Sequence, residues 1–400
     1  MSQGALAGIR VLEVGNFMAA PFCTLQLADL GAEVVKIENP DGGDLTRTNG
    51  PFLEGESSGF IRLNRNKRSL ALDLKSPRGK EIFRKLAERA DVLVENLRPG
   101  TMADLELDYP RLSKLNPRLV YVAASGWGQD GPYAQRPGLD IMAQGMSGLM
   151  SITGEEGGAA PVKVGVPVTD LACALYGAVA ALAALRVRDQ TGRGQFVDVC
   201  LFEAGVSLAV WEAGRYFATG EIPKPLGSAH QTSAPYQALK ASDGFFTIGA
   251  TSNKTWEAAC DVFGLQDLKT DPRFAKNHLR HQNRSAIAES IEAVSSQKPA
   301  RHWVDALDKA GVPCGVLQNY KQVFDDPHLN ERGFFSEAPH KKLGPVKQIG
   351  SPMRLSATPV AMKRAGPLLG EHSAQVLAEI GYTQEEIRGL ASAGVIKEPA

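Results

Sequence analysis

The most constraining feature of the sequence is a strand, a helix and a second strand within about thirty residues near the amino end. The segments IRVLEV and EVVKIE have the apolar character of buried strands, and the helix-like segment AAPFCTLQLADLG separates them. This is the length of a parallel crossover unit. The amino-terminal part of the chain is therefore predicted to build a parallel β-sheet.

The same pattern continues along the chain. Ser76 is expected to cap a helix over PRGKEIFRKLAERA, with Pro77 at its first position. The segments DVLVEN and LVYVAAS are apolar without alternation, which parallel sheets require because both of their faces are covered. We predict an α/β fold in which roughly the first two hundred residues form a doubly wound, mostly parallel sheet.

A change in composition marks a second domain. After the amphipathic segment 204–219 the chain reads IPKPLGSAHQTSAPY, which is rich in Pro, Gly and Ser and typical of a linker. The segment YQALKASDGFFTIGA then predicts two strands joined at Asp243-Gly244, with helices following. The predicted division is a large α/β domain over 1–205 and 330–400, a smaller inserted α+β domain over 225–325, and linkers over 206–224 and 326–329.

Charge and cysteine content exclude several classes of protein. Lys plus Arg and Asp plus Glu both number 44, so no overall field favours nucleic acid or a membrane surface. The five cysteines are scattered, which suits neither a disulfide framework nor a metal site. The amino end, MSQGALAGIRVLEVG, lacks the pattern of a secretory signal, and a cytoplasmic location is expected. The apolar run 171–185 is shorter than the roughly 20 residues of a membrane span, so it predicts a buried helix.

Asp170 stands immediately before that apolar run, in VPVTDL. A carboxylate at a helix start can cap free backbone N–H groups, and this structural interpretation competes with a chemical one. All histidines lie at or beyond His230, so a carboxylate near Asp170 would have to act without a nearby histidine in the sequence.

Three other segments are candidates for ligand binding. The turn GNFMAAP lacks the G-x-G-x-x-G of a dinucleotide site, so Glu38 is interpreted as a surface residue at a strand end. The basic segment NRNKRSLALDLK could be a solvated face or a phosphate site, and VENLRPG adds Asn96 and Arg98 directly after a strand. SITGEEGGAAPVKVG could be a surface loop or a loop that folds over a ligand.

Together these motifs resemble the family III CoA-transferases (CaiB/BaiF type), which include formyl-CoA:oxalate and carnitine CoA-transferases. The resemblance runs nearly end to end, through the segments GIRVLEV, LGAEVVKIENPDGGD, NRNKRSLALDLK, VLVENLRPG, AQGMSGLMSITG, GVPVTDL, TGRGQFVDV, DGFFTIG, GVPCGV and GPLLGEH. It implies that Asp170 is the nucleophile, forming an aspartyl anhydride and then an aspartyl-CoA thioester. A carboxylate of ordinary pKa, about 3.9, would be ionised at neutral pH without a general base.

The resemblance also implies contacts to coenzyme A, which is the substrate carrier, and no permanently bound cofactor. The positions that match the family's acyl-CoA site are Met18, Ala19, Asn39, Leu72, Lys75, Asn96, Leu97, Arg98 and Asp140. The chain departs from the family at Asn39 and Asp104, where arginines are frequent, and at Met18, where the formyl-CoA enzyme has a glutamine. Arg98 is expected to supply the missing charge. The segment GATSNKTWE lacks the glycine run of the family's mobile loop, so a closing lid of that kind is in doubt.

Family architecture implies a homodimer of interlocked rings, with an acyl-CoA donor and a carboxylic acid acceptor as partners. The expected pair is succinyl-CoA and a small dicarboxylate. One alternative is an α-methylacyl-CoA racemase, which needs a second base that its family supplies as a histidine where this chain has Leu139. Another is a non-catalytic acyl-CoA-binding protein. No metal is expected.

Overall fold

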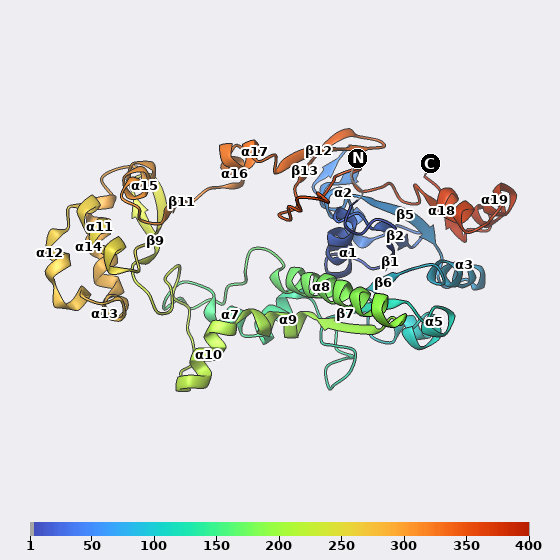
Figure 1. Cartoon of the computed structure of the whole chain (residues 1–400), viewed down its shortest axis with the longest axis horizontal. Coiled ribbons are helices and arrows are strands. Elements are labelled where there is room, and N and C mark those ends of the chain that lie inside the picture. Colours follow the sequence, from blue (N-terminus) through green and yellow to red (C-terminus); the bar gives the residue numbers. More distant parts are fainter. Residues whose placement is uncertain (1–3, 400) are drawn as a thin grey trace. The chain divides into compact units, whose positions relative to one another are not determined.

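The computed structural model describes residues 4–399 and has an α/β fold (Figure 1). The chain divides into two compact units, which we describe separately. The large unit contains residues 4–149, 163–218 and 328–399, and the small unit contains residues 150–162 and 219–327.

A seven-stranded sheet forms the centre of the large unit, in the order β14-β5-β2-β1-β6-β7-β8. All neighbours are parallel except β14, which runs antiparallel to β5. The first two parallel crossovers step outward on one side of β1 and the later ones on the other, so the predicted doubly wound sheet is present. The strands are β1 (Arg10–Val14), β2 (Glu33–Glu38), β5 (Lys67–Leu72), β6 (Val92–Glu95), β7 (Val120–Ser125), β8 (Phe196–Cys200) and β14 (Ile396–Lys397).

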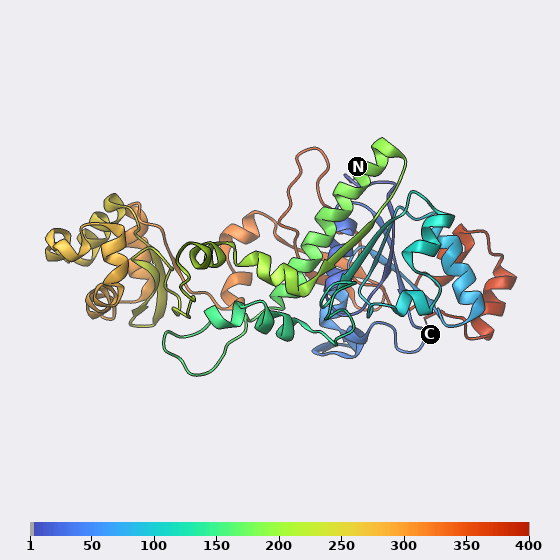
Figure 2. The same ribbon diagram turned by 90° about the horizontal axis from the view of Figure 1, so that it is seen from below.

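Helices cover both faces of this sheet (Figure 2). One face packs through Val11, Val92 and Val120 against α1 (Ala19–Asp29) and α8 (Val168–Thr191). The other face packs through Leu12, Leu93 and other residues against a second layer of helices. These are α3 (Pro77–Ala87), α5 (Tyr109–Leu115), α18 (Ser373–Glu379) and α19 (Gln384–Ser392). The absence of alternation in the strand sequences follows from this burial on both sides.

Local signals explain where several helices begin and end. Ser76 Oγ accepts a hydrogen bond from Gly79 N at 3.0 Å, and Pro77 occupies the first turn of α3, as predicted. Helix α8 ends at Gly192, whose φ of +75° is the left-handed conformation that glycine adopts readily. Further elements of the large unit are η1 (Leu45–Thr48), β3 (Phe52–Leu53), β4 (Glu56–Ser57), α2 (Ser58–Leu63), α4 (Thr101–Asp104), α6 (Asp140–Met146), α9 (Leu201–Leu208), α10 (Val210–Thr219), β12 (Phe335–His340) and β13 (Gly344–Ile349).

Helix α8 is longer than the sequence suggested. It has 24 residues, so the premise that the segment is too short to cross a membrane was wrong by length and hydropathy, whereas the predicted packing of the helix in the core is present. The polar residues at both ends belong to the helix. Its buried side packs against α1 and the sheet, as core helices do, and it is the one helix of residues 4–399 that passes this test.

The small unit is built on an antiparallel sheet in the order β11-β10-β9. Helices pack on it around Phe246, Trp256 and Trp303, and the predicted hairpin is present with β10 beginning at Gly244. Its elements are β9 (Tyr236–Ala241), β10 (Gly244–Gly249), α11 (Asn253–Phe263), α12 (Gln266–Thr270), η2 (Pro272–Phe274), α13 (Asn277–Gln282), α14 (Arg284–Ser295), α15 (Ala300–Lys309), β11 (Cys314–Val316) and α16 (Tyr320–Phe324).

The boundaries of the units differ from the predicted ones in two respects. Residues 150–162, expected in the large domain, belong to the small unit, where Glu156 pairs with Arg284 and Gly227 N donates to Gly154 O. The predicted linkers are also largely helical. Residues 206–224 include the end of α9 and all of α10, and 326–329 fall mainly in α17 (Pro327–Glu331); α7 (Leu149–Ile152) crosses between the units.

Candidate active site

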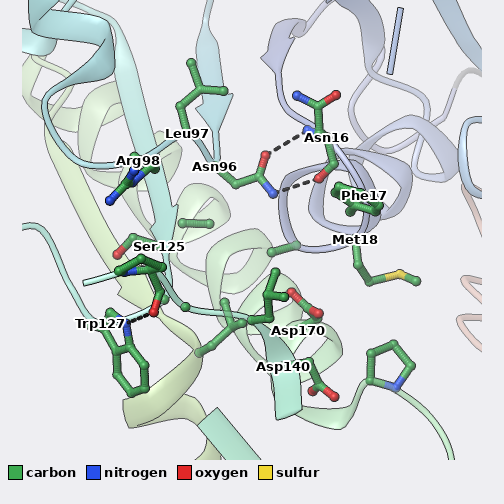
Figure 3. A pocket seen from close by; sticks show the side chains of 18 of the residues that line it. Asn16, Phe17, Met18, Asn96, Leu97, Arg98, Ser125, Trp127, Asp140 and Asp170 are labelled. Atoms are coloured by element: carbon green, nitrogen blue, oxygen red, sulfur yellow. Dashed lines mark hydrogen bonds between the residues drawn. The ribbon is translucent and has the colours of Figure 1, made fainter. Parts of the chain in front are cut away.

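A cavity of about 560 Å³ opens at the carboxyl ends of the central strands in the large unit (Figure 3). Its walls include residues 16–19 after β1, 96–99 after β6 and 125–127 after β7. Strands β1 and β6 are neighbours whose crossovers run in opposite directions. Open α/β sheets bind ligands at such a switch point, because loops from adjacent strands separate there and leave a crevice.

Asp170 lies in the first turn of α8 and its carboxylate points into this cavity (Figure 3). The residue before the helix is Pro167, and the start of α8 has no side-chain cap. Among residues 4–399, no hydrogen-bond donor to the Asp170 carboxylate is present. The capping interpretation is therefore wrong, and the carboxylate is available to a ligand.

The neighbouring carboxylate, Asp140, is held firmly at the start of α6. Asp140 Oδ1 accepts hydrogen bonds from Thr169 N at 3.0 Å and Thr169 Oγ1 at 2.7 Å. Asp140 Oδ2 accepts one from Gln144 Nε2 at 2.7 Å. These three hydrogen bonds fix the Asp140 carboxylate beside Thr169, the residue that precedes Asp170.

The surroundings of Asp170 make its proton affinity unusual. Burial raises the pKa of Asp170 to about 7, and the negative charge of Asp140 adds to the rise. The expectation of an ordinary aspartate, fully ionised at neutral pH, was therefore wrong. Near pH 7 the ionised and protonated forms coexist, and the ionised form is a more basic nucleophile than an exposed aspartate.

The turn after β1 is tied to the turn after β6. Asn96 Oδ1 accepts from Asn16 N at 2.9 Å, and Asn96 Nδ2 donates to Asn16 O at 2.8 Å (Figure 3). Phe17 has a φ of +61°, which is unfavourable for a residue with a side chain, and its N–H reaches Asp44 Oδ1 at 3.3 Å. These bonds hold the cavity wall in a defined conformation.

A buried set of charges, which we call the Glu13 cluster, is hydrogen-bonded to the turn after β1. It consists of Glu13, Lys36, Asp44 and Lys67, all of them buried. Lys36 Nζ pairs with Glu13, lies 2.8 Å from Asp44 Oδ2 and donates to Gly15 O at 2.8 Å. Lys67 Nζ lies 2.8 Å from Glu13 Oε2. Burial acts to raise the pKa of Glu13, but the two lysines outweigh it and lower that pKa to about 2.

Seven of the predicted site residues meet at the cavity. These are Met18, Ala19, Asn96, Leu97, Arg98, Asp140 and Asp170. Three others are not part of its lining: Asn39 and Lys75 are exposed elsewhere, and the Leu72 side chain is buried in the sheet at 1 % exposure. None of residues 151–165 lines the cavity either. The roles of these residues in acyl-CoA binding stay predictions.

Two interpretations of charged segments were wrong. Glu38 is buried rather than exposed, and it accepts from Arg47 Nε at 2.7 Å and from Ser69 Oγ at 2.6 Å. The basic segment 64–75 is largely neither a solvated face nor part of the cavity. Arg65 pairs with Asp29 at 2.6 Å, and Lys67 belongs to the Glu13 cluster.

The sequence interpretation also missed residues that line the cavity. Asn16 and Phe17 directly follow β1, and Trp127 follows β7, so their position after a strand was the available signal. Arg136 comes from the loop between β7 and α6, which has no periodic pattern to mark it. Groups of His, Cys, Asp and Glu that could hold a metal ion are absent from the part of the chain that the structure describes.

Comparisons with known proteins agree with this geometry. The profile of the family described as "CoA-transferase family III" matches residues 6–373. The succinyl-CoA:glutarate CoA-transferase of Mus musculus is 37% identical over 399 residues, covering 99% of this chain and 91% of the relative. The acetyl-CoA:oxalate CoA-transferase of Acetobacter aceti is 37% identical over 379 residues, covering 94% of this chain and 96% of the relative.

A solved structure gives the same result. The crystal structure of a CAIB/BAIF family protein from Brucella suis superimposes with a TM-score of 0.85 at 36% identity, covering 95% of this chain and all of that one. Fold, sequence profile and named relatives therefore agree over nearly the whole chain. The chain belongs to CoA-transferase family III and is a CoA-transferase.

Proposed function

We propose that this enzyme moves CoA from succinyl-CoA to a small dicarboxylic acid, with Asp170 as the covalent nucleophile. The observation that carries the proposal is an Asp170 carboxylate that points into the cavity and receives no hydrogen bond from the described chain. The names of several relatives give the substrate class. Besides the glutarate and oxalate enzymes, a succinyl-CoA:mesaconate CoA-transferase of Haloarcula hispanica is 37% identical.

The first half of the reaction loads CoA onto the enzyme. The Asp170 carboxylate attacks the thioester carbonyl, the C–S bond breaks, and an aspartyl-succinyl anhydride forms with release of CoA thiolate. The thiolate then attacks the aspartyl carbonyl, which breaks the anhydride, releases succinate and leaves an aspartyl-CoA thioester. Nucleophilic catalysis of this kind replaces one difficult displacement by easier steps.

The second half reverses these steps with the acceptor. The acceptor carboxylate attacks the aspartyl thioester, CoA thiolate leaves, and a second anhydride forms. The thiolate attacks the acceptor's carbonyl in that anhydride, the new CoA ester departs, and the Asp170 carboxylate is regenerated. None of these reaction steps transfers a proton, which fits a cavity whose described lining contains no histidine.

The electrostatic setting of Asp170 serves this chemistry. The raised pKa makes the ionised carboxylate more nucleophilic, and Asp170 lies in the first turn of α8, at the positive end of the helix dipole. Asp140 contributes to the raised pKa of Asp170, and its carboxylate is positioned by hydrogen bonds from Thr169 and Gln144.

Racemisation is not favoured at this site. A two-base mechanism needs a proton donor on the opposite face of the substrate. The position that would supply it holds Leu139, whose side chain is 63 % exposed and cannot titrate. Binding of acyl-CoA without catalysis is excluded by the family membership reported above.

An isotope experiment tests the covalent route. The enzyme turns over with succinyl-CoA and glutarate labelled with oxygen-18, and the peptide that contains Asp170 is then weighed by mass spectrometry. The proposed sequence leaves label in the Asp170 carboxylate, because the acceptor oxygen remains on the aspartyl carbonyl when the second anhydride breaks. An unlabelled peptide after many turnovers contradicts the mechanism, and label at the control peptide that contains Asp198 would show non-specific exchange.

We also propose that the enzyme works as a homodimer. Large apolar side chains project from α8 and α10: Val179 is 64 % exposed, Trp211 62 % and Phe217 82 %. Exposed apolar surface of this kind marks association sites. Light scattering over a dilution series should report twice the chain mass of 42.8 kDa, and a monomer at all concentrations would contradict the proposal.

A further inference from the structure

A second cavity of the large unit is separate from the one that contains Asp170. Its volume is about 330 Å³, which is enough for a small ligand. It lies between the strands β6, β7 and β8 and the short helices α4 and α5, which all contribute to its wall. Among residues 4–399, the two cavities have only Arg98 in common. We call this second cavity the Glu95 pocket.

The carboxyl group of Glu95 lies in the wall of this pocket with one of its oxygens unpartnered. Glu95 is the last residue of β6 and is 5 % exposed. Its Oε2 accepts a hydrogen bond from Leu97 N at 2.7 Å, whereas no donor and no cation within residues 4–399 pairs with Oε1. A largely buried acceptor without a partner costs free energy, so a ligand that donates to Oε1 is favoured there.

A second polar group of the wall also lacks a partner. Gln129 follows β7, and its Nε2 is buried without a hydrogen-bond acceptor in the described part of the chain. Its backbone N–H is already used, because it donates to Asp198 Oδ2 at 2.9 Å. Buried amide donors in proteins are nearly always hydrogen-bonded, so a ligand with an oxygen acceptor would complete this group.

Three aromatic rings form an apolar side of the pocket. Tyr109, Tyr121 and Phe196 contact one another, with ring centroids 5.6–5.9 Å apart. Burial raises the pKa of Tyr121, and the charge of Glu95 raises it further, so this ring and the carboxyl group are close together. The faces of aromatic rings attract cations. An ammonium group beside Glu95 would therefore meet both a carboxylate and an aromatic surface.

We propose that the Glu95 pocket binds a small amino alcohol with an apolar body. Its ammonium group donates to Glu95 Oε1, its hydroxyl oxygen accepts from Gln129 Nε2, and its apolar part packs on the three rings. The site goes beyond the proposed function, because a carboxylate next to Glu95 would be repelled and neither the acid nor a CoA phosphate suits this wall. Leu97, which donates to Glu95, also lines the Asp170 cavity, so the bound amine would adjoin the active-site wall.

A ligand-observed NMR titration of the purified full chain at pH 8 tests the proposal. Three probes share a phenyl ring: phenylalaninol carries an ammonium and a hydroxyl group, 2-phenylethylamine only the ammonium, and 2-phenylethanol only the hydroxyl. Most of Glu95 is ionised at pH 8, because burial raises its pKa to about 7. The native enzyme should bind phenylalaninol most tightly and 2-phenylethanol at least about tenfold more weakly, the value of a hydrogen bond to a charged group.

Two variants assign the contacts. Glu95→Gln should bind phenylalaninol about tenfold more weakly, and Gln129→Leu should bind it no better than 2-phenylethylamine. Gln129 lies in a loop, so its variant decides the matter even if Glu95→Gln does not fold. The control Glu88→Gln changes an exposed residue at the end of α3 and should bind all probes like the native enzyme.

CoA distinguishes the two cavities. Saturating CoA should leave the affinity for phenylalaninol within about threefold, because the cavities have only Arg98 in common among residues 4–399. Displacement of the probe by CoA would place it in the Asp170 cavity and overturn the proposal. A native enzyme that binds no probe, or that binds the amine and the alcohol equally, overturns it as well.

Discussion

Two carboxyl groups of the large unit are withdrawn from water but titrate in opposite directions. Glu13 is fully buried between Lys36 and Lys67, and its pKa falls to about 2. Asp170 is partly buried beside another carboxylate, and its pKa rises to about 7. Burial acts to raise both values, so the difference comes from the neighbouring charges.

The contrast separates a structural acid from a reactive one. Each Glu13 oxygen already has a lysine or hydroxyl partner, so ligand chemistry has no access to it. No cation among the described residues pairs with Asp170, so its lone pairs stay available to a substrate. The same lack of a partner disfavours the ionised form of the carboxyl group. Unpartnered burial, rather than burial itself, is the mark of the reactive group.

The largest expected effect is the loss of activity when Asp170 is replaced by an uncharged residue. Asp170→Asn should reduce transfer by at least roughly a thousandfold, because an amide cannot form the anhydride. Its melting temperature at pH 8 should not fall, since the native structure no longer has to hold a charge that it disfavours. The control Asp189→Asn changes an exposed residue on the same helix. An Asp170→Asn enzyme with near-native rates would remove Asp170 from the mechanism.

The next effect is on stability when the structural acid is neutralised. Glu13→Gln leaves two lysines without their buried partner and should lower the free energy of unfolding by about 3–5 kcal/mol. Urea denaturation measures the change, with Glu33→Gln at the exposed start of β2 as control. The folded pKa of Glu13 is lowered, so its contribution is present above about pH 4.5 and is lost as the pH falls toward 2. Equal stability of the two variants would contradict a stabilising cluster.

A smaller effect is expected on the pH profile. kcat/KM should rise with pH through about 7, because only ionised Asp170 attacks. Asp140→Asn removes the neighbouring negative charge and should shift the rise to lower pH. Burial is the larger cause of the raised pKa, so the shift should be less than half of the way back to the ordinary value. Asp140→Glu keeps the charge and should leave the profile in place, and an unshifted Asp140→Asn profile would exclude this coupling.

The smallest effect is expected when Arg98, a cation without an acidic partner in the described chain, is replaced. Unlike Lys36, Arg98 has no carboxylate partner within the described chain, so Arg98→Ala should leave the unfolding free energy unchanged within about 0.5 kcal/mol. It should raise KM for the acyl-CoA about tenfold if its charge meets the ligand. Steady-state kinetics with Arg118→Ala as control measures this, and an unchanged KM would separate Arg98 from the binding site.

The sequence predicted the parts of this molecule that depend on local patterns. Apolar strands without alternation and the Ser76-Pro77 helix start indicated the doubly wound sheet, whereas the candidate nucleophile Asp170 came from the resemblance to family III CoA-transferases. The Glu13 cluster had no such signal, because Lys67 meets a carboxylate 54 positions away and a lysine in sequence is normally exposed. The pKa of Asp170 also depended on Asp140, which only the folded chain brings close.

Residues 150–162 and Arg136 show the same limit in loops. The composition of SITGEEGGAAPV indicates a loop but not which unit it joins, and that is decided by its pairing with Arg284 in a distant helix. Arg136 lies in an irregular segment whose rings stack only after β7 and α9 are in place.

The pairing of β14 with β5 has a consequence for synthesis on the ribosome. Ile396 lies opposite Leu72, and Ala71 N donates to Ser373 Oγ across 302 positions of sequence. One edge of β5 therefore stays open while most of the protein is being translated, and open strand edges pair readily with other chains. We expect nascent chains stalled before residue 373 to engage chaperones or aggregate, whereas release of the full sequence closes the sheet.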